Sequence, residues 1–160
     1  MWVTIIADAS FCPNTFKAGY GFWIASQRGK FGGDGVMKVD PVNNISAEMM
    51  ALLNGLHVAV KRGLIRTKDS VLLQTDCQPA IDAFKRNRKN ISKQEIELVQ
   101  WFRSFTKEHK LHIKLKHVKG HSSNTATKYV VNNICDQNAR RNMRQARNLH
   151  NQNQIMEYLK

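Results

Sequence analysis

Residues 2–10 read Trp-Val-Thr-Ile-Ile-Ala-Asp-Ala-Ser. The β-branched and apolar residues of this stretch predict a buried strand. One carboxylate, Asp8, interrupts the run near its end. A charge at the end of a buried strand is costly unless a partner or a metal ion compensates it. We therefore expect other functional groups, from distant parts of the sequence, to gather around Asp8.

Three further acids occupy comparable positions. Glu48 opens an apolar helical run, Asp76 follows the apolar strand predicted at 71–75, and Asp136 lies in a late helical stretch. Carboxylate oxygens are hard ligands of the kind that Mg²⁺ prefers. Two metal ions about 3.5–4 Å apart can both activate water and offset charge on a leaving oxygen. We predict that these four carboxylates converge on divalent metal and cut a nucleic-acid backbone.

Composition and charge limit the class of protein. The chain has 160 residues, which is about one domain, and 42 % of them are apolar. Its 25 Lys and Arg against 12 Asp and Glu give a formal charge of +13, which favours a polyanionic partner such as nucleic acid. The three cysteines show no Cys-x-x-Cys spacing, which favours a reducing, cytoplasmic compartment. We expect no signal peptide and no membrane partner, because no apolar run approaches the roughly 20 residues of a membrane span.

Turn residues and the spacing of apolar residues predict the order of strands and helices. Strands over 18–26 and 31–39 follow the first strand through short turns, as in an antiparallel meander. A helix is predicted over 47–62, with Ser46 as its N-cap. The later expected elements are a strand over 71–75, a short helix from Pro79 to about Phe84, a helix behind the capping box at 92–95, a strand over 111–118 and a helix over 130–147.

This order predicts an α/β fold in which helices pack on a mixed sheet. We expect one domain over residues 1–147. Residues 148–160 are expected to form a C-terminal tail that is either frayed or a short helix.

Six short stretches resemble ribonuclease H type 1, and they occur in that family's order. They are residues 5–10 (Ile-Ile-Ala-Asp-Ala-Ser), 19–21 (Gly-Tyr-Gly), 43–48 (Asn-Asn-Ile-Ser-Ala-Glu), 73–78 (Leu-Gln-Thr-Asp-Cys-Gln), 118–121 (Val-Lys-Gly-His) and 135–139 (Cys-Asp-Gln-Asn-Ala). Each stretch alone is weak, but together they are specific. The resemblance implies a five-stranded mixed sheet flanked by helices, in a monomer that cleaves the RNA strand of an RNA/DNA hybrid.

The resemblance also implies roles for single residues. Asp8, Glu48, Asp76 and Asp136 match the family's metal-binding acids, with Asp8 shared between two Mg²⁺ ions and Mn²⁺ as an alternative metal. His121 matches a histidine that assists proton transfer or product release. Without the resemblance, His121 would be interpreted as a surface residue of a polar loop.

Two sets of residues are candidates for binding the substrate. The resemblance suggests four amides near the minor groove of the hybrid: Asn14, Asn43, Asn44 and Gln78. Their alternative interpretation is turn and cap chemistry. The second set is a dense run of cations that follows the short helix: Lys85, Arg86, Arg88 and Lys89. Its alternative interpretation is a solvated loop.

The remaining acids are expected to be solvated surface charges. They are Asp34, Asp40, Asp69, Asp82, Glu95, Glu97, Glu108 and Glu157.

Two other functions fit the same fold class. A non-catalytic nucleic-acid-binding domain would predict a broken set of acids, whereas all four acids are present. A different nuclease of the superfold, such as a resolvase or proofreading exonuclease, remains an alternative because a fold does not fix function. The Lys-Gly-His sequence at 119–121 favours the ribonuclease.

Overall fold

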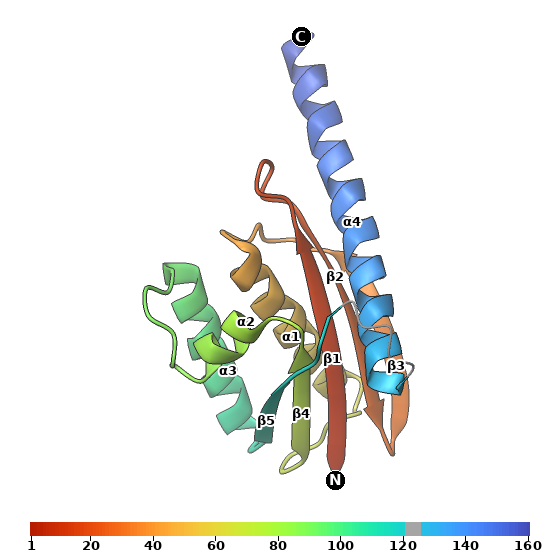
Figure 1. Ribbon diagram of the computed structural model, residues 1–160, viewed down its shortest axis with the longest axis vertical. Helices are drawn as coiled ribbons and strands as arrows, with labels where there is room; N and C mark the ends of the chain where they lie inside the picture. The colour runs from red at the N-terminus through yellow and green to blue at the C-terminus, as the bar shows by residue number, and fades with distance from the viewer. Residues whose placement is uncertain (121–125) are drawn as a thin grey trace.

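The computed structural model describes residues 1–120 and 126–160. One sheet with helices on both faces makes up the body (Figure 1). The elements are β1 (Trp2–Phe11), β2 (Ala18–Ser26), β3 (Gly29–Val36), α1 (Asn44–Lys61), β4 (Ser70–Thr75), α2 (Gln78–Phe84), α3 (Lys93–Glu108), β5 (His112–His117) and α4 (Thr127–Tyr158). The strand order is β3-β2-β1-β4-β5, antiparallel through β3, β2 and β1 and parallel through β1, β4 and β5. The predicted five-stranded mixed sheet is confirmed.

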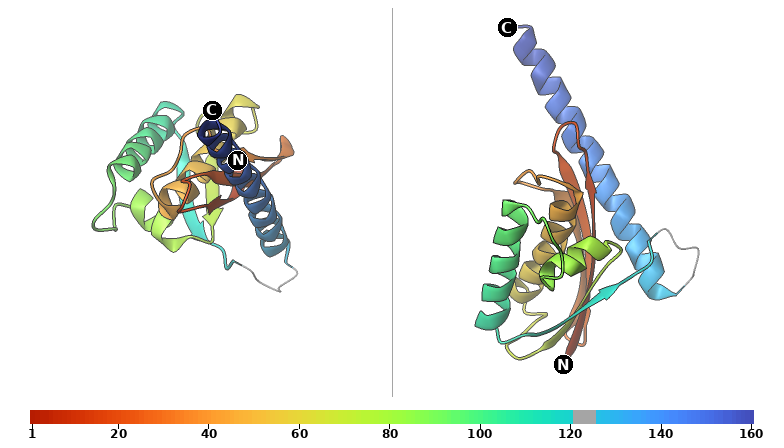
Figure 2. Two further views of the ribbon diagram at one scale, coloured as in Figure 1. Left: turned by 90° about the horizontal axis from the view of Figure 1, so that it is seen from above. Right: turned by 60° about the vertical axis from the view of Figure 1, so that its left-hand side comes forward.

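The two faces of the sheet are covered by different helices. Helices α1, α2 and α3 lie on one side, and α4 crosses the other side over β1, β2 and β3 (Figure 2). Ile5 points toward α1, since a side chain added at Gly55 of that helix would meet it. Successive residues of a strand point to opposite faces. Asp8 therefore lies on the face that α4 covers.

Two glycines allow α4 to approach the sheet closely. A Cβ atom at Gly19 would collide with the carbonyl oxygen of Ala139, and one at Gly21 would collide with the carbonyl oxygen of Cys135. The backbones of β2 and α4 can therefore touch only where side chains are absent. This close approach fixes the next residue of the helix, Asp136, beside β1.

Several element boundaries differ from the prediction. β3 begins at Gly29 rather than at residue 31 and ends at Val36. Ser46 does not cap α1. The N-cap is Asn43, whose extended backbone precedes the helix and whose side chain accepts a hydrogen bond of 2.8 Å from the Ser46 N–H. Ser46 is instead buried within the first turn.

Helix α4 is much longer than predicted. It runs without a break for 32 residues, so the segment 148–160 is helical almost to its end and is neither a frayed coil nor a separate helix. Every residue from 151 to 160 is exposed, so apolar periodicity could not reveal this part. Residues 147–160 contain no Gly or Pro to end the helix. No helix in the described parts of the chain is long and apolar enough to cross a membrane.

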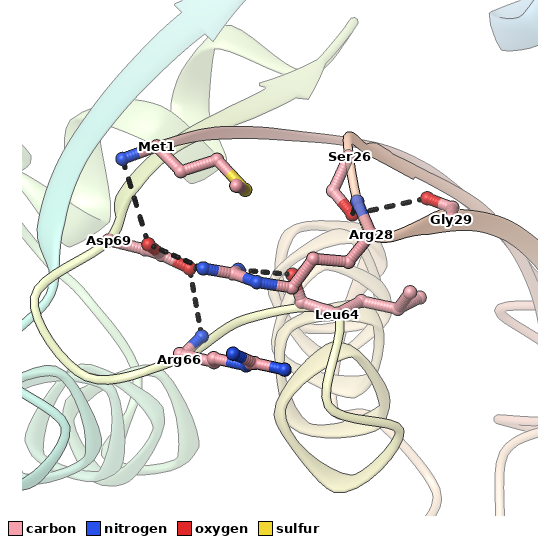
Figure 3. Close-up of polar contacts among 7 residues, drawn as sticks. All are labelled: Met1, Ser26, Arg28, Gly29, Leu64, Arg66 and Asp69. Carbon is pink, nitrogen blue, oxygen red and sulfur yellow. Dashed lines mark hydrogen bonds and ion pairs between the residues drawn. The ribbon is translucent and has the colours of Figure 1, made fainter.

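Asp69 is not a solvated surface charge, contrary to the prediction. Its residue is 5 % exposed, and its carboxylate accepts hydrogen bonds from the Arg28 guanidinium and from the Arg66 N–H (Figure 3). The terminal ammonium of Met1 lies 3.7 Å away. The hydrogen bond from Arg28 lowers the pKa of Asp69 to about 2. This network ties the β2–β3 turn to the loop before β4.

Glu95 is also buried, against the prediction. It completes a capping box with Ser92 at the start of α3, as the sequence indicated. One of its oxygens also accepts a hydrogen bond of 2.7 Å from Arg88. The pairing compensates a carboxylate that would otherwise be buried and uncompensated. Arg88 thereby fastens the basic segment 85–89 to α3.

Candidate metal and nucleic-acid site

The carboxyl ends of two neighbouring parallel strands bring the first two acids together. Ile6 of β1 pairs with Gln74 of β4, so Asp8 and Asp76, each two residues further along, lie at the same edge. The first turns of α1 bring Glu48 to this edge, and α4 brings Asp136. All four carboxylates line one open cavity of about 790 Å³.

Three of the acids form a tight cluster. Carboxylate oxygens of Asp8, Glu48 and Asp76 all lie within 4.8 Å of one another. The N–H of Ala9 donates to both Asp8, at 3.0 Å, and Glu48, at 3.1 Å. The second oxygen of Asp8 is buried and has no hydrogen-bond donor among the described residues. A buried acceptor without a donor is costly, unless a cation takes that position.

The pKa values of two of the clustered carboxyl groups are raised, because both groups are buried and too little positive charge lies near them. Burial and the neighbouring Asp76 charge raise the pKa of Asp8 to about 8. Burial and the Asp8 charge raise the pKa of Glu48 well above its ordinary value. Like charges in one buried site cannot all ionise without compensation. The donor set, all hard oxygen, is suited to a divalent ion such as Mg²⁺.

Asp136 lies at the edge of this cluster. Its side chain is 16 % exposed and is held by an ion pair with Arg140, one helical turn further along α4, at 3.2 Å. Its proximity to Asp8 contributes to the raised pKa of that residue. Arg140 also lines the cavity. The sequence prediction missed Arg140, although its spacing of four residues from a predicted ligand was available as a signal.

The backbone on the other side of Asp76 is also fixed. His117 of β5 contacts the Asp76 carbonyl oxygen through its ring at 3.0 Å. A Cβ atom at Gly120 would collide with the Asp76 carboxylate, so a larger residue there would displace that carboxylate. His121, the predicted catalytic histidine, lies outside the described residues. Its role stays a prediction.

The predicted substrate-binding residues fall into separate places. Asn44 and Gln78 line the cavity, and the Gln78 amide donates to Asp82 at 2.9 Å. Asn43 uses its side-chain oxygen to cap α1, and Asn14 is exposed in the β1–β2 turn. Of the four basic residues, Arg88 is paired with Glu95, while the other three are exposed between α2 and α3: Lys85, Arg86 and Lys89.

The strand order together with an acidic cavity at the ends of β1 and β4 defines the class of protein, an RNase H-like fold. The RNase H family model matches residues 2–144, and the chain belongs to this family.

Solved structures agree with this fold. The N-terminal RNase H domain of Rv2228c from Mycobacterium tuberculosis has a TM-score of 0.69 at 20 % identity, over 92 % of this chain and 96 % of that one. LC11-RNase H1, solved in complex with an RNA/DNA hybrid, has a TM-score of 0.69 at 16 % identity, over 90 % and 98 %. RNase H1 from the archaeon Halobacterium salinarum NRC-1 has a TM-score of 0.67 at 19 % identity, over 91 % and 99 %. No curated protein matches the chain.

Proposed function

We propose that this protein is an endoribonuclease that hydrolyses the RNA strand of RNA/DNA hybrids with two divalent metal ions. The observation that carries the proposal is the cavity in which Asp8, Glu48, Asp76 and Asp136 lie together with too little compensating charge. The complex of LC11-RNase H1 with an RNA/DNA hybrid supports the choice of substrate. The formal charge of +13 also suits a nucleic-acid partner.

The four carboxylates would hold the metal, Mg²⁺ or alternatively Mn²⁺. Asp8 is the best candidate for a shared ligand, since one of its oxygens accepts from Ala9 and the other has no donor in the described chain. When bound, the ions supply Lewis-acid chemistry, lowering the pKa of water and offsetting charge on the phosphate oxygens.

Residues of the protein perform the remaining tasks. The Ala9 N–H holds the carboxylates of Asp8 and Glu48 in fixed orientations. Asn44 and Gln78 present amides at the cavity wall, where they are placed to contact the substrate. Amides can donate to and accept from the 2′-hydroxyl, which distinguishes RNA from DNA.

His121 is proposed to assist proton transfer rather than to hold metal. His121→Ala is then expected to lower kcat by about 10²–10⁴-fold, which is typical of general acid–base groups. Its affinity for Mg²⁺, measured by calorimetry, is expected to match that of the wild type. A large loss of Mg²⁺ affinity would contradict the role and make His121 a ligand.

A substrate comparison tests the proposed function. Labelled RNA/DNA hybrid, duplex RNA and duplex DNA of one sequence are incubated with the protein, with Mg²⁺ or with EDTA. Cleavage confined to the RNA strand of the hybrid and dependent on Mg²⁺ is expected. Equal cleavage of duplex DNA would indicate a different nuclease, and binding without cleavage would indicate a non-catalytic domain.

A further inference from the structure

After Asp136, helix α4 is rich in positive charge and carries no acid along most of its remaining length. Residues 137–156 contain four arginines and no Asp or Glu. Cations are favoured electrostatically only in the last turn of a helix. These arginines lie well before that turn, because the helix continues to Tyr158. Helix-end electrostatics therefore does not explain them.

Two of these arginines lie on the face of α4 that points to the cavity, and a third borders that face. At about 3.6 residues per turn, Arg140 and Arg147 lie within about 40° of the direction of Asp136, and Arg144 lies about 80° from it. Asp136 and Arg140 both line the cavity. We call Arg140, Arg144 and Arg147 the α4 arginine row. In the described structure, no acidic side chain pairs with Arg144 or Arg147.

Arg141 differs from its neighbours. It points about 140° away from Asp136 around the helix axis. Its guanidinium pairs with Asp34 of β3 at 3.1 Å, so it faces the sheet edge rather than the cavity. Arg141 is thus a matched control within the same helix.

The row leads from the cavity toward the end of the sheet at the β1–β2 turn. Figures 1 and 2 show α4 continuing past the ends of the strands, with its C-terminal end far from the body. The hydroxyl of Thr15 and, further, the charge of Arg147 lower the pKa of Cys12, so Arg147 lies beside the β1–β2 turn. The rise of about 1.5 Å per residue places Arg147 about 16 Å beyond Asp136 along the helix axis.

This spacing matches a nucleic-acid backbone. From Arg140 to Arg147 the row spans about 10 Å along the axis. Phosphates of one strand follow one another at about 3.4 Å along a duplex, so the row faces about three of them. Guanidinium groups suit phosphate because they donate two parallel hydrogen bonds.

We propose that the α4 arginine row binds the backbone of the hybrid beyond the cavity, as a substrate handle on the side opposite to the segment 85–89. This inference rests on the proposed function, because it assumes that a hybrid occupies the acidic cavity. Arg140 begins the row at the metal site, and Arg144 and Arg147 extend it.

Binding without cleavage tests the inference. The double variant Arg144→Gln/Arg147→Gln, the control Arg141→Gln and the wild type are titrated onto fluorescent hybrid in EDTA, from about 50 to 200 mM salt. The double variant is expected to bind more weakly, with a slope of log affinity against log salt shallower by about 1.8, because two phosphates are no longer neutralised. Arg141→Gln is expected to follow the wild type. If the plots of log affinity against log salt coincide for all three proteins, the proposal is overturned.

Substrate length gives an independent readout. About 16 Å corresponds to about five base pairs. Hybrids that end within that distance of the cleaved bond on the α4 side should bind the wild type more weakly than longer ones. The double variant should not distinguish the two lengths. Equal length dependence in both proteins would also overturn the proposal.

The two proposals can fail separately. One outcome is that the wild type binds the hybrid more tightly than the double variant but does not cleave it with Mg²⁺. That outcome would refute the proposed function and support the role of the α4 arginine row as a handle. Normal cleavage with unaltered binding of the double variant would refute only the handle. Circular dichroism of each variant confirms that α4 is intact, which is expected because Arg144 is exposed and neither substituted residue lies in the core.

Discussion

At the scale of single residues, Asp8 shows why the site is costly without metal. Its strand buries it, its neighbour Asp76 repels it, and one of its oxygens has no donor among the described residues. The sequence revealed the position, because a carboxylate near the end of an apolar strand is rare unless it is compensated. How tightly the acids cluster could be learned only from the tertiary structure, because Glu48 lies 40 positions further along the chain.

The metal-free protein is expected to lose stability as pH rises. The pKa of Asp8 is raised from 3.8 to about 8 in the folded protein, so the folded state binds more protons than the unfolded state between about pH 4 and 8. Its favourable contribution is therefore complete below about pH 4 and is lost as pH rises through about 8. The side chain introduced by Asp8→Asn binds no proton on folding, so the variant avoids this loss and should be more stable in EDTA near pH 7 by about 1 kcal/mol or more, or about 2–4 °C in Tm.

Thermal unfolding from pH 4 to 8, with EDTA and with Mg²⁺, measures this effect. Mg²⁺ should stabilise the wild type more than Asp8→Asn. The control is Asp40→Asn, whose carboxylate is exposed and paired with Lys17. An equal or lower Tm of Asp8→Asn in EDTA at pH 7 would contradict the electrostatic account.

Two buried acids show what sequence patterns miss at this scale. Asp69 finds Arg28 across 41 positions of sequence, and no local pattern signals such a pairing. Glu95 was recognised as part of a capping box, but its burial depends on Arg88, which comes from a segment interpreted as solvated or substrate-bound. Solvated acids are the usual case, and only tertiary contacts identify the exceptions.

At the scale of elements, the segment 85–89 divides into an anchor and three exposed cations. Lys85→Ser/Arg86→Ser/Lys89→Ser should raise KM for hybrid and make the salt dependence of binding shallower, by about 0.9 for each phosphate that the variant no longer binds. Arg88→Ser should instead lower the free energy of unfolding by about 1–3 kcal/mol, since it leaves the Glu95 carboxylate buried and unpaired. Hybrid titrations over salt and urea unfolding separate the two effects.

Each variant serves as the control for the other. If the triple variant binds hybrid with the same affinity and salt slope as the wild type, the segment is a solvated loop. If Arg88→Ser unfolds at the same urea concentration as the wild type, the ion pair has no anchoring role.

Helix α4 marks the limit of element prediction. The sequence placed its central part correctly, because Cys135 and Ala139 recur at helical spacing and are buried against the sheet. Its C-terminal part has no buried stripe, and an exposed segment of a dozen residues is marginal as an isolated helix. The C-terminal part of α4 is nevertheless helical, because it extends the helix that the buried central part already forms.

At the scale of the whole molecule, positive charge flanks the acidic cavity on both sides. The segment 85–89 follows α2 on one side, and helix α4, which carries the arginine row, leads away on the other (Figures 1 and 2). The order of elements and the meeting of the four acids at one edge of the sheet could be predicted from strand ends and family-like stretches. The strand order and the close approach of β2 and α4 could not, because they depend on pairings between distant segments.

The most direct test of the account is the rate of hybrid cleavage by Asp8→Asn, with wild type and Asp40→Asn as references at saturating Mg²⁺. Partners of metal ligands typically contribute 10–100-fold, so loss of a ligand itself should cost more than about 100-fold. We predict that Asp8→Asn is folded and essentially inactive, while Asp40→Asn cleaves at about the wild-type rate. A folded Asp8→Asn protein that cleaves hybrid at the wild-type rate would contradict the assignment of this cavity as the catalytic metal site.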